Sequence, residues 1–102
     1  KHMILSGQNI DVDTAFKIGL VTKVVAREEL MDEAKKLAEV LAAKSPIALR
    51  TAKSCLNFAL DTDLSSGLDY EIKSWALLYT TQDQKEGMKA FLEKRRPDFK
   101  GK

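Results

Sequence analysis

The chain has 102 residues, of which 44% are hydrophobic and 31% are charged, and its 17 basic and 15 acidic residues nearly balance. This length permits one small domain or part of one, and no apolar run approaches the roughly 20 residues that cross a bilayer. The composition is that of a globular protein, so we expect no membrane partner. Acidic residues alternate with basic ones along the chain, so we expect no nucleic-acid partner either.

Residues 1–6 start abruptly, with no initiator region or signal peptide, and the first three residues are consistent with a cloning remnant. We therefore expect the chain to be cut at its N-terminus. Asp11 is placed to cap a short helix over residues 12–18, which Gly19 ends. The β-branched run 20–25 predicts a short strand, but nothing else in the sequence predicts a partner for it. An unpaired strand indicates that the rest of a sheet lies outside this chain.

Two amphipathic helices are predicted next, over residues 28–44 and 47–60. Ser45 and Pro46 separate them, because proline is tolerated in the first turn of a helix. Asp32 and Lys36 are spaced to pair on the solvent face of the first helix. Cys55 is the only cysteine, and its apolar neighbours predict a buried thiol in a reducing compartment.

A third long helix follows, capped by Asp61 or Asp63. Its apolar stripe must be buried against something, and consists of Leu64, Leu68, Ile72, Trp75 and Tyr79. The last helix is predicted to open with a capping box, in which Asp83 accepts a hydrogen bond from a first-turn amide and Glu86 reaches back. Pro97 ends regular helix, and the tail beyond it keeps Phe99, an aromatic residue that is costly to leave exposed.

The order and spacing of these short motifs resemble the C-terminal third of crotonase-family enzymes, the enoyl-CoA hydratase and isomerase family. Each motif alone is weak, but their succession is specific and covers essentially the whole chain. Trp75 departs from the phenylalanine that is common in the family, and residues 12–14 depart from its usual alanine and glutamate. The matching positions are Ser6-Gly7, Ala15, Gly19-Leu20-Val21, Val24-Val25, Ser45-Pro46, Ala48, Ala52, Lys53, Glu71, Asp83, Glu86-Gly87-Met88, Ala90-Phe91, Glu93-Lys94-Arg95, Pro97 and Phe99.

The resemblance implies a mainly α fold: the helical, trimer-forming C-terminal region of the crotonase ββα-spiral fold, with one short strand left from the core. Residues 1–26 would end the spiral core, and residues 27–102 would form the helical assembly domain. Family hydratases add water across the 2,3 double bond of an enoyl-CoA in fatty-acid metabolism. They use two glutamates and an oxyanion hole of backbone amides. Both would lie upstream of this chain, so the resemblance implies no catalytic residue and no metal ligand here, and an inactive isolated fragment.

The glutamates that the chain does contain have simpler interpretations. The acidic residues of the helix over residues 28–44 lie on a solvated face. Glu71 precedes a position expected to be buried, and a structural salt bridge explains it better than catalysis does. We therefore expect none of these carboxylates to replace the missing pair.

The resemblance assigns this region to subunit assembly and to covering a neighbouring subunit's CoA site. Phe91 and Lys94 match an aromatic and a lysine near the adenosine and phosphate end of CoA, and Trp75 matches an aromatic near the same surface. Core packing for Phe91 and Trp75, and a merely solvated charge for Lys94, are equally open interpretations. The implied partners are an acyl-CoA thioester and further copies of the protein, as a trimer or a dimer of trimers. No cofactor is implied, since CoA belongs to the substrate.

Two other functions compete with an enoyl-CoA hydratase fragment: a stand-alone helical acyl-CoA-binding protein, and a protein-interaction module without a ligand. The unpaired run 20–25 argues against the first, and the specific ending from Glu86 to Phe99 argues against the second. Within the family, isomerases, dehydratases and hydrolases share this ending, and hydratase is favoured by resemblance alone. A cytoplasmic location is expected, with the mitochondrial matrix as the alternative.

Overall fold

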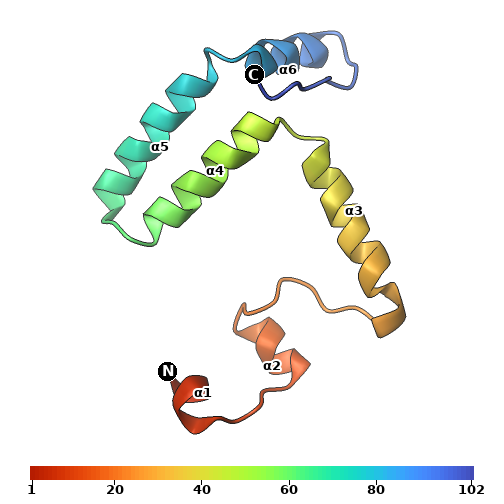
Figure 1. Ribbon diagram of the computed structural model, residues 1–102, viewed down its shortest axis with the longest axis vertical. Coiled ribbons are helices and arrows are strands. Elements are labelled where there is room, and N and C mark those ends of the chain that lie inside the picture. Colours follow the sequence, from red (N-terminus) through yellow and green to blue (C-terminus); the bar gives the residue numbers. More distant parts are fainter. The chain divides into compact units, whose positions relative to one another are not determined.

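The computed structural model describes all residues from Lys1 to Lys102 and contains helices but no strand (Figure 1). It divides into two compact units, residues 1–36 and 37–102. A mainly α fold is thus confirmed, whereas the division into a spiral remnant and an assembly domain after residue 26 stays a prediction. No helix combines the length and the apolar character needed to cross a membrane.

In the first unit, α1 spans His2–Ser6, α2 spans Val12–Lys17 and a 3-10 turn spans Arg27–Glu29. Asp11 caps α2 as predicted, with its carboxylate accepting from the Thr14 amide at 2.7 Å, and this bond lowers the pKa of Asp11. The strand predicted for residues 20–25 is wrong. This segment is irregular, because a strand needs a neighbour for its backbone hydrogen bonds and the chain offers none.

Helix α3 spans Leu30–Ala42, shorter at both ends than the predicted helix over residues 28–44. The expected pair between Asp32 and Lys36 is not formed. Lys36 instead pairs with Glu33 at 2.6 Å, and Lys23 also pairs with Glu33. The Glu33 carboxylate thus pairs with two lysines, and these bonds lower the pKa of Glu33 to about 2.

Helices α4, Pro46–Ala59, and α5, Leu64–Leu78, run side by side as a hairpin (Figure 1). The predicted cap of α5 is confirmed, since Asp63, rather than Asp61, accepts from the Ser66 amide. Ser45, which was predicted only to separate two helices, also caps α4, with its Oγ accepting from the Ala48 amide. Tyr70 joins the two helices, since its ring lies 4.6 Å from that of Phe58.

Helix α6 spans Gln82–Leu92, and Thr81 is its N-cap, accepting from the Gln84 amide at 3.1 Å. The predicted capping box at Asp83 and Glu86 is therefore wrong, because these carboxylates bind the chain that follows α6. That tail returns along α6 (Figure 1) and brings the Phe99 ring against Gly87, where an added Cβ would lie 3.4 Å from it. Phe99 is half-buried, which agrees with the expectation that this aromatic side chain is not left fully exposed.

The apolar faces of these helices are largely uncovered. Ala15 and Ala90 are the only hydrophobic residues that are buried, and no large side chain is fully buried. The stripe predicted along α5 is exposed throughout, from 49% at Leu68 to 79% at Leu64. A chain with this many apolar residues normally buries them, so these faces are suited to contact other protein.

Candidate functional site

A groove between α4 and α5 has a volume of about 420 Å³, within the usual range for a ligand pocket. The side chains that line it are mainly apolar, and many of them are small. Cys55 opens onto it and is half-buried, not buried as predicted. The lining residues are Ala48, Thr51, Ala52, Cys55, Leu56, Ala59, Asp63, Leu64, Gly67, Leu68, Glu71, Ser74, Trp75 and Leu78.

Glu71 is the acidic side chain on the α5 wall of this groove, and it is exposed. The salt bridge predicted for Glu71 is not formed, since it takes part in none of the chain's ion pairs. The expectation failed because its neighbour Ile72 is 65% exposed, and an exposed carboxylate needs no cation.

A second cavity, of about 340 Å³, lies where the start of α4, the end of α5 and α6 meet. Trp75 lines both cavities and is 58% exposed, and its ring meets that of Tyr79 edge to face at 4.6 Å. Phe91 and Lys94 line neither cavity. The structure therefore gathers Phe91 and Lys94 at the end of α6 and does not join Trp75 to them in one cavity.

Lys94 occupies an unusual backbone position just past Glu93, the C-cap of α6. Its φ is 53°, and it is the only residue other than glycine with a positive φ. The Lys94 amide bonds the Phe91 carbonyl at 3.2 Å, and the Arg95 amide bonds the Ala90 carbonyl at 3.0 Å. These bonds form the helix-ending motif that ordinarily places glycine in this left-handed position. A lysine there is strained, and strain of this kind marks a candidate functional residue.

The Asp83 carboxylate ties the tail to the rest of the second unit. It is only 3% exposed, and it accepts from the Ser45 hydroxyl at 2.6 Å, from the Lys100 amide at 2.8 Å and from the Gly101 amide at 3.0 Å. Burial alone would raise the pKa of Asp83, but these hydrogen bonds outweigh it and leave the pKa below its ordinary value. Gly101, with φ 73°, packs on Pro46 at a distance that would place a Cβ 3.5 Å from the proline ring.

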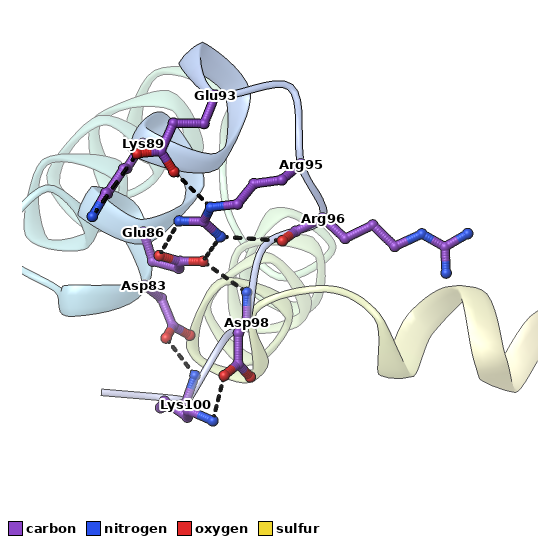
Figure 2. A network of polar contacts seen from close by, with 8 residues as sticks. All are labelled: Asp83, Glu86, Lys89, Glu93, Arg95, Arg96, Asp98 and Lys100. Atoms are coloured by element: carbon purple, nitrogen blue, oxygen red, sulfur yellow. Dashed lines mark hydrogen bonds and ion pairs between the residues drawn. The ribbon is translucent and has the colours of Figure 1, made fainter.

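Glu86, one turn further along α6, holds the beginning of the same tail (Figure 2). Its two oxygens accept from the Arg95 guanidinium at 2.6 and 3.0 Å, and one also accepts from the Asp98 amide at 2.8 Å. Arg95 bonds Glu93 as well, at 2.7 Å. These contacts lower the pKa of Glu86 to about 2. Figure 2 shows the Arg96 side chain directed away from this network.

The role of Asp83 was missed from the sequence because its partners are distant along the chain. Ser45 lies 38 residues before it, and Lys100 and Gly101 lie 17 and 18 residues after it. The local pattern from Asp83 to Glu86 is compatible with a capping box, and no nearby residue indicates otherwise. The structure shows this role, because the Asp83 carboxylate is buried and both of its oxygens accept hydrogen bonds.

No cluster of three or more histidine, cysteine or acidic side chains capable of holding a metal ion is formed. Nor do two carboxylates converge on one cavity as a free acid and base pair. Glu33 and Glu86 are each bound by cations, and the groove carries Glu71 with Asp63, which is engaged as the cap of α5.

Comparison with known proteins adds independent information. A family model described as enoyl-CoA hydratase/isomerase matches residues 1–102. The chain is 43% identical over 99 residues to a crotonyl-CoA hydratase of Syntrophomonas wolfei, covering 97% of this chain and 38% of that protein. It is 38% identical over 96 residues to a short-chain-enoyl-CoA hydratase of Clostridium acetobutylicum, covering 94% and 37%. A crystal structure of an enoyl-CoA hydratase from Bacillus anthracis superposes with a TM-score of 0.94 at 37% identity, covering all of this chain and 40% of that one.

Proposed function

Because the chain belongs to the enoyl-CoA hydratase/isomerase family, we propose that it is the C-terminal part of an enoyl-CoA hydratase that hydrates the 2,3 double bond of its substrate. The observation that carries this proposal is the similarity along the whole chain to relatives that are named hydratases. The chain spans less than half the length of those relatives, so the activity is proposed for the longer protein. That protein would be a lyase of fatty-acid metabolism acting on acyl-CoA thioesters.

We infer that this part of the protein supplies neither the acid nor the base of the reaction. A group that both takes and delivers a proton works best when its pKa lies near the working pH. Glu33 and Glu86 have pKa values of about 2 and cannot deliver a proton near neutral pH. His2 is the only histidine. The catalytic glutamates and the oxyanion amides would come from the remainder of the longer protein, and the isolated chain would be inactive.

The contribution that we assign to this chain is assembly and cover of the CoA site. The uncovered apolar faces of α4 and α5 suit contact with further protein, either the remainder of the same chain or neighbouring copies in a trimer or dimer of trimers. Phe91, 79% exposed, and Lys94 are free to approach the adenosine and phosphates of CoA in a neighbouring subunit, with Trp75 nearer the groove. No cofactor besides the CoA of the substrate is proposed.

A hydration assay with crotonyl-CoA on the full-length protein tests this proposal. We expect turnover by the full-length protein, and we expect Lys94→Glu to raise the KM for CoA substrates more than it lowers kcat. Failure of the full-length protein to hydrate any short or medium enoyl-CoA would contradict the reaction. Unchanged kinetics of Lys94→Glu at low salt would contradict the assignment of Lys94.

Calorimetry with CoA separates this proposal from a stand-alone acyl-CoA-binding protein or an interaction module without a ligand. A stand-alone carrier binds acyl-CoA by itself, whereas the 102-residue chain should bind weakly or not at all. The relatives above come from bacteria, which supports a cytoplasmic location, and the mitochondrial matrix is the alternative for a eukaryotic source.

A further inference from the structure

The tail that follows α6 is fastened at both ends by carboxylates from that helix. We propose that Asp83 and Glu86 are positioning residues that hold Lys94 in place for the phosphate end of CoA. This inference rests on the proposed function, which supplies the CoA ligand, but the fastening itself is seen in the hydrogen bonds of the chain.

The first support is the completeness of the Asp83 contacts. A buried carboxylate is costly unless its oxygens are bonded, and here a hydroxyl and backbone amides of consecutive residues bond both of them. All of these partners donate hydrogens. An asparagine could present only one oxygen to them, and its NH₂ group would face donors. The position therefore requires a carboxylate. Without it the far end of the tail keeps the bond from the Asp83 amide to the Lys102 carbonyl but loses its side-chain bonds to α6.

The second support is the position of Glu86 relative to Lys94. Glu86 grips Arg95, the residue that directly follows Lys94, in a paired contact of two oxygens with two nitrogens. It also accepts from the Asp98 amide. The segment from Arg95 to Gly101 is thus bonded to α6 near its start and at its end (Figure 2).

The third support is the strained backbone of Lys94. A lysine at φ 53° returns to a relaxed conformation unless its surroundings hold it. Its own helix-ending bonds and the grip on Arg95 together supply that restraint. A charge held before the ligand arrives loses less conformational freedom on binding. Loosening the tail should therefore weaken recognition of the phosphates and leave the thioester chemistry intact.

Substrate truncation provides a direct test on the full-length protein. An enoyl-pantetheine thioester has the same reacting group as enoyl-CoA but lacks the adenosine and its phosphates. We expect Asp83→Asn and Glu86→Gln each to lower kcat/KM for enoyl-CoA by several-fold to about tenfold, mainly through KM, with little change for the pantetheine thioester. Asp69→Asn and Glu39→Gln are matched controls on exposed positions, and both should retain the normal ratio of the two substrates.

Hydrogen exchange supplies a second readout. In Asp83→Asn the Lys100 and Gly101 amides should exchange faster by roughly tenfold or more, while amides inside α4 and α5 keep their protection. An equal loss of activity on both thioesters, in either variant, would assign these carboxylates to general folding and overturn the inference. If Asp83→Asn does not fold, the ratio of kcat/KM for enoyl-CoA to kcat/KM for the pantetheine thioester in Glu86→Gln tests the inference.

The two proposals fail in different ways. If Lys94→Ala leaves the preference for CoA over pantetheine unchanged, the assigned role of Lys94 in CoA binding is wrong. If Lys94→Ala lowers that preference but Asp83→Asn and Glu86→Gln do not, only the positioning role is wrong.

Discussion

Replacing Lys94 by glycine should make the end of α6 more stable while weakening CoA recognition. Lys94 adopts the left-handed conformation, with φ 53°, which costs an ordinary residue about 1–2 kcal/mol. Glycine removes this cost, but it also has more conformational freedom than lysine in the unfolded chain. That freedom lowers the free energy of unfolding by about 0.4–1 kcal/mol. The net expected gain is therefore about 0.5–1 kcal/mol.

Native-state hydrogen exchange at the Arg95 amide measures this gain locally, because that amide bonds the Ala90 carbonyl across the strained residue. The expected stabilisation corresponds to exchange that is about two- to fivefold slower in Lys94→Gly. Lys94→Ala is the matched control, since it also removes the ammonium group but keeps a Cβ, and its exchange should not slow. Both variants should raise the KM for enoyl-CoA in the full-length protein. Faster exchange in Lys94→Gly than in the unchanged protein would refute the strain argument.

Thr81→Ala should destabilise α6 by about 1 kcal/mol, because Thr81 caps the helix, whereas Thr80→Ala at the neighbouring exposed position should cost much less; urea unfolding compares them. The pKa of Glu86 is lowered from 4.5 to about 2, so its stabilising contacts are complete above about pH 4.5 and are lost as the pH falls toward 2. Thermal unfolding should show this loss between pH 5 and pH 2 and a shallower dependence in Glu86→Gln, and identical slopes would contradict it. The isolated chain should self-associate through its exposed apolar faces, and light scattering that gives a clean monomer at high concentration would count against this.

The sequence predicted those features that are decided by neighbouring residues. Asp11 and Asp63 were recognisable as caps because each bonds an amide three residues further on. The bounds of α4, Pro46–Ala59, lie within one residue of the predicted range 47–60 for the same reason. The apolar stripe of α5 was also predictable from its spacing, but the cover expected for it is not supplied by this chain, and the stripe is exposed.

Features that depend on distant residues could not be predicted in this way. Glu33 takes Lys23 as a partner from ten residues away, which the spacing of Asp32 and Lys36 could not indicate. The run 20–25 has the composition of a strand, but strand formation is decided by a partner and not by composition. Of the candidate site, the residues Phe91, Lys94 and Trp75 came from resemblance, whereas the fastening of the tail became visible only in the structure.

We propose that the chemistry of the hydratase resides outside these residues, in the remainder of the longer protein. Crotonyl-CoA hydration by the isolated 102-residue chain, run in parallel with the full-length protein under the same conditions, tests this proposal. We predict turnover by the full-length protein and none above the uncatalysed rate by the isolated chain. Hydration of crotonyl-CoA by the isolated chain would show that the catalytic groups lie within these residues and would contradict the proposal.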